Sequence, residues 1–389
     1  MNFARSITSP RIEHSSMSDI VSSFEIRISS LASMSNRQQE IYSLLEEVLK
    51  RGGTDLHLCY GRSPTLRVDG SLASMDDKPA LSIEDVKELS LALLTPDQQD
   101  KFWAQKDIDF AFNFQEKARF RSNIYQQMGK VAAAFRFIPS QIRTLEDLSL
   151  PSMLHQFTQA TQGFFLVVGP SGHGKSTALA AMVDEVNHTR FDHIITIEDP
   201  VEYLFKQDKC IIDQREVGID VLDFHRGLRS MFREDADVVM IGEMRDPETI
   251  STAITAAETG HLIFSTLHTN TASQTIDRII DVFPPYQQPQ IRSQLASTLL
   301  GILSRRLIPC LKGGLINAVE LLIANPAVRN LVREGKIHQI DMIIDTSLEE
   351  GMISLNRSLA DLVTRGLISY ENAELYSVSP AELRLLLGK

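Results

Sequence analysis

The sequence predicts an α/β fold, and the prediction rests on a repeated order of strand and helix in the second half of the chain. The apolar run FFLVV, residues 164–168, precedes a glycine-rich turn and a stretch with helical spacing. Three later apolar runs, IITIE, DVVMIG and HLIFSTL, are each followed by a turn or a helix. Such alternation is typical of a mostly parallel sheet that is covered by helices.

Length and composition limit the classes of protein. A chain of 389 residues, 43% of them apolar and 23% charged, is expected to fold into two or three domains with separate cores. The formal charge of −11 argues against a nucleic-acid partner, because non-specific binding to nucleic acid uses a basic surface.

The cysteines and the hydropathy pattern indicate where the protein works. Cys59, Cys210 and Cys310 lie far apart and form no C-x-x-C pair, so a zinc knuckle and a disulfide framework are excluded. A reducing cytoplasm fits this usage best. No apolar stretch approaches the ~20 residues of a membrane-spanning helix, and the N-terminus lacks the apolar core of a signal peptide. We therefore expect no direct membrane insertion, and any link to a membrane is expected to run through a partner.

The first part of the chain is expected to hold a tail, a small domain and a linker. Residues 1–37 contain eleven serines and are interpreted as a disordered tail, with a translation start at Met34 left open. An α+β domain is expected over 38–138, beginning with the helical pattern RQQEIYSLLEEVLK and its stop at GG. The helical stretch SIEDVKELSLALL and five strand-like runs follow: TDLHLCY, PTLRVDG, DIDFAFNF, ARFRSNIYQQ and KVAAAFRFI. Residues 139–151, bounded by prolines, are expected to form a linker.

The rest of the chain is expected to hold the α/β domain over 152–325 and a helical region over 326–389. In that last region, apolar residues recur at helical spacing in three stretches: 327–334, 352–365 and 371–386.

The turn after FFLVV has the pattern of a P-loop. Gly169-x4-Gly174-Lys175-Ser176 stands between a strand and a helix, which is the context that this motif requires. Glycines let several backbone N–H groups point at one anion, and the helix N-terminus adds a favourable dipole. The alternative, a glycine-rich turn that binds nothing, is disfavoured by the complete motif. The candidate phosphate-binding residues are Gly169, Pro170, Ser171, Gly172, His173, Gly174, Lys175, Ser176 and Thr177.

Three residues of this motif carry separate expectations. Lys175 is expected to reach the β- and γ-phosphates of a nucleotide, and the Ser176 hydroxyl is expected to ligate Mg²⁺. His173 is unusual but occupies a free position of the pattern, so it puts nothing essential in doubt.

Two acidic stretches end predicted strands. IITIEDPVEY carries Glu198, Asp199 and Glu202, and DVVMIGEMRD carries Glu243. P-loop enzymes need one carboxylate near Mg²⁺ and another that polarises the attacking water, and such groups converge at strand ends. Gly242 replaces the usual acidic residue at one of these ends, which weakens the assignment of Glu243 to Mg²⁺. Solvated loop carboxylates are the alternative interpretation.

Two histidines and three arginines are further candidates. His261 and His268 are seven residues apart around one strand, so they point to opposite faces and cannot both bind a single metal. Arg119 and Arg121 share a strand face, and Arg136 lies on a later strand. Ordinary hydrogen bonds for the histidines and a solvated sheet surface for the arginines are the alternatives to a role at the nucleotide.

Together, these motifs resemble a known family. GPSGHGKST, TIEDPVEY, VVMIGEMRD and ETGHLIFSTLHT, in this order and spacing, are similar to the Walker A, Asp, Walker B and His boxes of secretion-superfamily ATPases. AVRNLVRE resembles the AIRNLIRE signature of the type IV pilus retraction ATPases, the PilT type. The resemblance extends from TDLHL through RFRSNIYQQ and QREVG to AVRNLVREGK.

The resemblance implies a fold and an activity. It implies a PAS-like N-terminal domain, a RecA-like P-loop ATPase core and a homohexamer that hydrolyses ATP with Mg²⁺ between its subunits. The implied work is pilus retraction and twitching motility, driven through an inner-membrane platform protein by a cytoplasmic motor peripheral to that membrane. A second retraction ATPase working beside it is left open.

The resemblance also implies roles for single residues. Glu202 is similar in position to the general base, Glu243 to the Walker B carboxylate that binds Mg²⁺, and Lys175 to the phosphate-binding lysine. His261 and His268 would couple the nucleotide state to the neighbouring domain. The implied phosphate contacts are Arg119, Arg121 and Arg136.

Related families are the alternatives. The stretch that starts with SLEEGM at residue 347 also resembles the accessory retraction ATPases, the PilU type, and ATPases of the DotB kind remain open as well. Pilus-assembly and type II secretion ATPases normally carry a four-cysteine zinc element, which this sequence lacks. The charge argues against a DNA translocase, and the intact Lys175, Glu202 and Glu243 argue against a ring subunit without activity. AVRNLVRE favours the main retraction motor.

Overall fold

The computed structural model describes residues 36–388 except 69, 115–117 and 140. The tail expected over 1–37, with Met34, therefore lies almost entirely outside the described residues. These described residues divide into two compact units: those within Met1–Phe114 and Phe120–Phe137 form unit 1, and those within Gln115–Arg119 and Ile138–Lys389 form unit 2.

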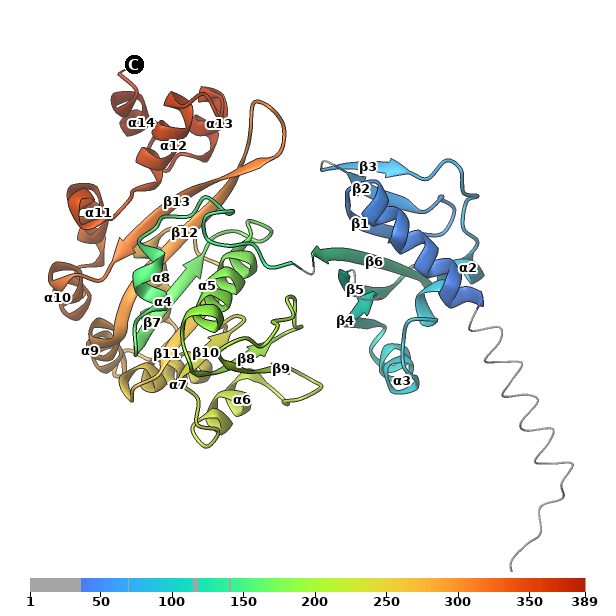
Figure 1. The fold of residues 1–389 in the computed structure, drawn as a ribbon, viewed down its shortest axis with the longest axis horizontal. Helices are drawn as coiled ribbons and strands as arrows, with labels where there is room; N and C mark the ends of the chain where they lie inside the picture. Colours follow the sequence, from blue (N-terminus) through green and yellow to red (C-terminus); the bar gives the residue numbers. More distant parts are fainter. Residues whose placement is uncertain (1–35, 69, 115–117, 140, 389) are drawn as a thin grey trace, which may run out of the picture. The chain divides into compact units, whose positions relative to one another are not determined.

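Unit 1 is built on a six-stranded sheet (Figure 1). The strand order is β3-β2-β1-β6-β5-β4, and β1 pairs antiparallel with both β2 and β6. The strands are β1 (Gly53–Leu58), β2 (Thr65–Val68), β3 (Ser71–Ser74), β4 (Asp107–Phe114), β5 (Ala118–Gln127) and β6 (Lys130–Pro139). The five expected strands are confirmed. The sequence does not predict β3, because all four of its side chains are exposed and no apolar alternation marks it.

Three helices occur among the described residues of unit 1. The expected first helix spans 36–50 and ends before Gly52, whose φ of 63° lies in the left-handed region that glycine adopts without strain. The helix α2 (Ile83–Leu91) is also expected, whereas α3 (Pro96–Gln105) is not. Phe102 is the buried residue of α3, so its apolar periodicity is weak, although Thr95 and Gln98 form a capping box at its start.

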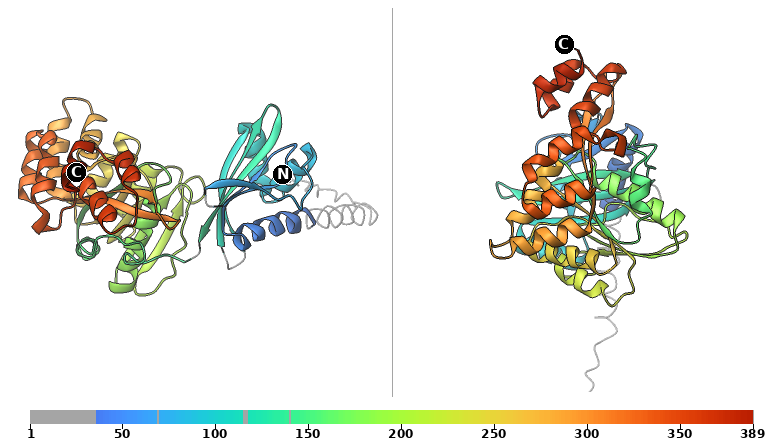
Figure 2. Two further views of the ribbon diagram at one scale, coloured as in Figure 1. Left: turned by 90° about the horizontal axis from the view of Figure 1, so that it is seen from above. Right: turned by 90° about the vertical axis from the view of Figure 1, so that its left-hand side faces the viewer.

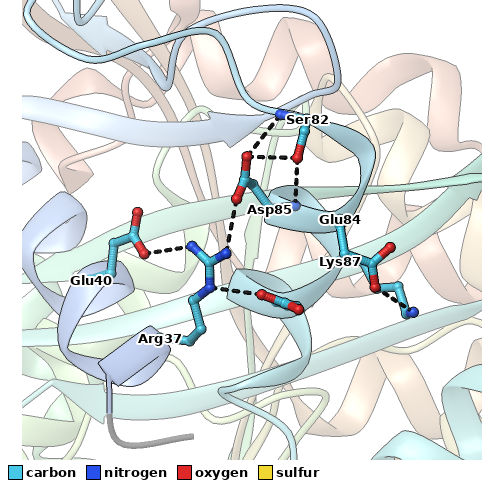
Figure 3. A network of polar contacts seen from close by, with 7 residues as sticks. Arg37, Glu40, Ser82, Glu84, Asp85 and Lys87 are labelled. Carbon is cyan, nitrogen blue, oxygen red and sulfur yellow. Dashed lines mark hydrogen bonds and ion pairs between the residues drawn. The ribbon is translucent and has the colours of Figure 1, made fainter. Parts of the chain in front are cut away.

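A polar network joins the first helix to α2 (Figure 3). The guanidinium of Arg37 donates to Glu88 at 2.8 Å, to Asp85 at 2.9 Å and to Glu40 at 2.7 Å. Asp85 also closes the capping box of α2, because it accepts the backbone N–H of Ser82 while the Ser82 hydroxyl accepts the N–H of Asp85. The start of α2 is thereby fixed against the first helix.

Unit 2 contains a seven-stranded sheet in the order β13-β12-β7-β11-β10-β8-β9 (Figure 1). All neighbours are parallel except the edge strand β13, which pairs antiparallel with β12. The strands are β7 (Gly163–Val168), β8 (His193–Glu198), β9 (Ile211–Glu216), β10 (Val238–Ile241), β11 (Leu262–Leu267), β12 (Leu299–Pro309) and β13 (Leu315–Ile323). The predicted α/β class and the four predicted strands of this part are confirmed.

Helices cover both faces of the sheet in unit 2. The even-numbered positions of β7, such as Phe164 and Leu166, pack with α6 to α9 and with helices that follow Asn325, while Phe165 and Val167 pack with α4 and α5. This double coverage explains why β7, β8, β10 and β11 are almost continuously apolar. The helices up to β12 are α4 (Leu154–Thr158), α5 (Lys175–Thr189), α6 (Phe224–Met231), α7 (Pro247–Glu258), α8 (Ala272–Asp281) and α9 (Gln288–Thr298).

The segment expected as a linker is packed into unit 2. Residues 141–153 form turns rather than a helix or a strand. Leu145, Leu148 and Leu150 are nevertheless buried in the same core as α5.

After Asn325 every element is helical, as the sequence predicts. The elements are α10 (Pro326–Glu334), η1 (Ile337–Gln339), α11 (Ile340–Thr346), η2 (Leu348–Glu350), α12 (Leu355–Thr364), α13 (Tyr370–Tyr376) and α14 (Pro380–Leu386). The predicted stretch 371–386 is two helices, because Pro380 begins a new one. The last three helices gather around their own small core beside Ile308 and Ala318 of the β12–β13 hairpin (Figures 1 and 2).

Across the part of the chain that the structure describes, none of the helices combines the length and the apolar character that crossing a membrane requires.

Candidate functional site

The carboxyl ends of four neighbouring strands define the candidate site. β7, β11, β10 and β8 lie side by side and run parallel, so their C-terminal ends meet at one edge of the sheet. The loop 169–174 leaves the end of β7 and leads into α5. Ligands of open α/β sheets bind at this edge, and a helix N-terminus there favours an anion.

The backbone of this loop requires its glycines. Gly169, Gly172 and Gly174 have φ angles of 142°, 78° and 76°, which side-chain-bearing residues rarely adopt. A Cβ atom on Gly169 would also overlap the carbonyl oxygen of Arg305 in β12. The loop is therefore packed closely against β12.

Lys175 lies at the centre of the site. Its side chain is buried, and Nζ donates to the carbonyl oxygens of Gly169 and Pro170 at 3.0 Å each. Burial lowers the pKa of Lys175, and the nearby carboxylates of Glu243 and Glu202 oppose this shift. The ammonium group therefore stands at the mouth of the loop with two acidic groups around it.

Glu243 and His268 complete a chain of contacts that begins at Lys175. Nζ of Lys175 lies 3.4 Å from Nδ1 of His268, and Nε2 of His268 lies 3.4 Å from a carboxylate oxygen of Glu243. The other oxygen of Glu243 pairs with Arg245 at 2.5 Å. The structure thus brings together three predicted residues from α5, from the end of β11 and from the end of β10.

Glu202 follows β8 and is held by a buried neighbour. Its backbone N–H lies 3.5 Å from a carboxylate oxygen of Glu198. Burial raises the pKa of Glu198 to about 7, against the hydrogen bonds that its carboxyl group accepts from Thr196 and Gln214. Glu198 thus supports the loop that carries Glu202.

The remaining residues of the loop motif differ in exposure. Ser176 is exposed at the start of α5, as is Ser171 in the loop, whereas Thr177 is half-buried. The Thr177 hydroxyl lies 2.9 Å from the hydroxyl of Tyr203, which follows Glu202 in the chain.

His261 lies at the other edge of the sheet. Its carbonyl oxygen accepts the N–H of Gly163 at the start of β7, and its Nδ1 lies 3.0 Å from the carbonyl oxygen of Ala256. The length of β11 therefore separates His261 from His268, and within one chain the structure does not bring His261 to the loop 169–174. No group of three or more His, Cys, Asp or Glu side chains placed to hold a metal occurs among the described residues.

The three predicted arginines lie on β5 and β6. Arg119 and Arg121 share the face of β5 that alternates with the buried one, as expected. Arg119 is grouped with unit 2, where it donates to the carbonyl oxygen of Val201 at 2.7 Å and pairs with Glu216 at 3.3 Å. Arg136 belongs to unit 1 and pairs with Asp55 at 2.8 Å.

Arg305 is a residue of the site that the sequence does not predict. Its side chain is only 1% exposed, and one end of the guanidinium donates to the carbonyl oxygen of Gly174. The other end donates to Asn317 at 2.5 Å, and Asn317 donates to the carbonyl oxygen of Leu148 at 2.6 Å. Burial lowers the pKa of Arg305 to about 10, so the group stays charged at neutral pH. The sequence does contain one sign of a buried arginine here, because Arg305 and Arg306 stand together inside an otherwise apolar run.

Comparison with known proteins gives a consistent result. A family described as type II/IV secretion system protein matches residues 37–326. The type IV pilus retraction ATPase PilT of Pseudomonas aeruginosa is 44% identical over 86% of this chain and 97% of its own length. The type IV pilus ATPase PilU of the same organism is 36% identical over 90% of this chain and 91% of its own length.

Solved structures show the same similarity. The crystal structure of the pilus retraction motor PilT with bound ADP has a TM-score of 0.81 and 44% identity, covering 88% of this chain and 98% of that one. The ATPase DotB of Legionella pneumophila shares the fold, with a TM-score of 0.74 at 24% identity over 85% of this chain and 93% of that one.

Proposed function

The chain belongs to the type II/IV secretion system protein family, within its PilT-type retraction ATPases, and from this premise we propose that it is an ATP-hydrolysing motor of type IV pilus retraction. One observation of the structure carries the proposal. The glycine loop, Lys175, His268 and Glu243 converge at the carboxyl edge of a parallel sheet. That arrangement offers an anion site with a cation at its centre and carboxylates beside it.

The loop 169–174 and Lys175 bind the phosphates of ATP in this proposal. The ammonium group of Lys175 exchanges its bonds to the carbonyl oxygens of Gly169 and Pro170 for bonds to phosphate oxygens. The backbone N–H groups at the start of α5, including that of Thr177, add the favourable end of the helix dipole.

The residues beside the loop also fit Mg²⁺. This cation prefers oxygen ligands and takes only one or two of them from the protein. The exposed hydroxyl of Ser176 and the carboxylate of Glu243, which already contacts the guanidinium of Arg245 at 2.5 Å, are such ligands. Bound Mg²⁺ would neutralise charge on the phosphates.

Glu202 is the proposed general base. Its effect on the pKa of Lys175 supports a position near the phosphates, where the carboxylate orients the attacking water and accepts its proton. Glu198 contacts the backbone N–H of Glu202 and is proposed to position it.

The larger assembly belongs to the same proposal. We infer a PAS-like domain over 38–138, a RecA-like ATPase domain over 152–325 and a helical region over 326–389. The linker over 139–151 would then be a connection that packs on the ATPase domain. In a homohexamer, Arg119, Arg121 and Arg136 contact phosphate, and His261 with His268 couples the nucleotide state to the next domain. The motor works in the cytoplasm on an inner-membrane platform protein.

The accessory PilU-type function is the second candidate. Identity of 36% to PilU against 44% to PilT, over similar shares of the chain, favours the main motor. The DotB kind is supported by a similar fold alone.

ATP hydrolysis at increasing protein concentration tests the proposal. We expect the activity per chain to rise as rings form, and Glu202→Gln to lower it roughly 100-fold or more, as for loss of a general base. The exposed Glu349→Gln in unit 2 is the matched control and should retain activity. If the protein bound ATP but hydrolysed little of it at every protein concentration, the accessory PilU-type function would be favoured instead.

A further inference from the structure

The side chain of His173 joins the phosphate loop to β12. The backbone N–H of Leu307 donates to Nδ1 of His173 at 2.9 Å, across 134 residues of sequence. The pairing of β12 with β7 ends at Ser304 opposite Val168. The N–H of Leu307 therefore lies beyond the last residue of β7, and the histidine ring supplies the acceptor that a longer strand would have provided.

A second contact fixes the next residue of the loop to the same strand. Arg305 donates to the carbonyl oxygen of Gly174, and the loop backbone at Gly169 approaches the carbonyl oxygen of Arg305. The loop is thus held against β12 at its first residue, Gly169, and at its last two, His173 and Gly174. Its shape depends on these contacts, because the loop lies outside any helix or strand.

The contact at His173 exists in one protonation state. Nδ1 accepts a hydrogen bond only when it carries no proton. The charged groups that act on the ring are Arg305 and Arg306 of β12 and Lys175 at the start of α5, and all are cationic. Burial, followed by these three charges, lowers the pKa of His173, so the ring is neutral at neutral pH.

We propose that His173 is a positioning residue: its neutral ring holds the phosphate loop to β12, and nucleotide affinity depends on the hydrogen bond from Leu307. The inference rests on the proposed nucleotide site and adds to it a residue that acts through the loop backbone. Acid breaks the contact, because protonation puts a hydrogen on Nδ1 of His173. Nδ1 then faces the N–H of Leu307 as a second donor and can no longer accept from it.

Two amide variants separate this role from simple packing. In His173→Asn the amide oxygen takes the place of Nδ1, whereas in His173→Gln the polar group lies nearer the place of Nε2. The full-length protein with each substitution is titrated with fluorescent ADP and Mg²⁺ between about pH 5 and about pH 8, because the lowered pKa of His173 places its protonation at the acid end of the histidine range. His188→Asn, an exposed histidine at the far end of α5, is the control.

We expect His173→Gln to bind ADP about five- to tenfold more weakly than wild type, the size of one net hydrogen bond. His173→Asn should recover most of that loss at neutral pH. Below neutral pH the wild type should lose affinity relative to His173→Asn. Protonation of ADP itself acts equally on all variants and cancels in this ratio.

Hydrogen exchange of the Leu307 amide without nucleotide gives an independent readout. Exchange should be faster in His173→Gln than in wild type or His173→Asn. Equal affinities of the two amide variants at every pH, or unchanged exchange at Leu307, would overturn the role of His173 while leaving the nucleotide site in place. A wild-type protein that binds no ADP would overturn the proposed function as well.

Discussion

Glu198 is the residue whose burial has a direct consequence for stability. Its pKa is raised to about 7 from a usual value of 4.5, mainly because burial disfavours the charged form. A carboxyl group with a raised pKa in the folded state ionises more readily in the unfolded state. Ionisation of Glu198 therefore destabilises the folded protein. This destabilisation is absent below the pKa of the unfolded state, grows as the pH rises from about 4.5 to about 7, and is complete above that.

We expect Glu198→Gln to be more stable than wild type at about pH 8, by up to about 3 kcal/mol, because the amide keeps the hydrogen bond from Thr196 without a buried charge. At about pH 4, below the usual pKa of 4.5, the difference should nearly vanish. Urea unfolding of both proteins across this range measures it, with the exposed Glu349→Gln as the control. If the free energy of unfolding changed with pH in the same way for Glu198→Gln and wild type, ionisation of Glu198 would not destabilise the folded protein.

The sequence predicts the acidic and basic residues that come from the same sheet edge. Lys175, Glu243 and His268 each follow a strongly apolar run, and parallel strands bring the ends of such runs together. Arg305 is not predicted, since its contact with Gly174 depends on a strand that joins the sheet 131 residues later. His173 is seen in the sequence, but its partner is a backbone N–H, which no residue type reveals.

At the scale of one element, the capping box at the start of α2 is expected to stabilise unit 1 (Figure 3). Ser82 and Asp85 satisfy each other's backbone N–H groups there. Replacing Ser82 with alanine should lower the free energy of unfolding by about 1 kcal/mol, as for other N-caps. Chemical denaturation followed through unit 1 measures the change.

Ser71→Ala is the matched control for this substitution, because Ser71 is exposed on the edge strand β3. The ion pairs of Arg37 should contribute less than the cap, since its side chain and that of Asp85 are each about a third exposed to solvent. Equal effects of Ser82→Ala and Ser71→Ala would mean that the capping box does not stabilise α2.

Some helices and strands can be predicted from the sequence more readily than others. The strands β7, β8, β10 and β11 are buried on both faces and are therefore read as apolar runs. Three of the elements that the sequence does not predict carry weak or interrupted patterns. β9 has two exposed residues among its six, β12 is interrupted by Ser304, Arg305 and Arg306, and α3 buries Phe102 alone.

At the scale of the whole molecule, the two compact units are expected to unfold in separate steps. The glycine loop, Lys175 and Glu243 all belong to unit 2. At protein concentrations below those at which rings form, ADP with Mg²⁺ should therefore stabilise only the transition of unit 2, by about 2.7 kcal/mol when the ligand is at 100 times its Kd. Differential scanning calorimetry with and without ADP resolves the two transitions.

Lys175→Ala is the control for that experiment, since removing the central cation should abolish the shift without changing the other transition. A single transition that ADP shifts as a whole would show instead that the two units unfold cooperatively.

The end of β12 has a consequence for how this chain can vary in length. Arg305 holds the phosphate loop, Arg306 donates to the carbonyl oxygen of Tyr376 in α13, and Ile308 lies in the core of the last three helices. Successive side chains of a strand point to opposite faces, so one inserted or deleted residue would exchange both sets of contacts at once. Insertions and deletions in related sequences should thus fall in the hairpin turn that follows at 310–314, and should spare residues 305–308 of β12.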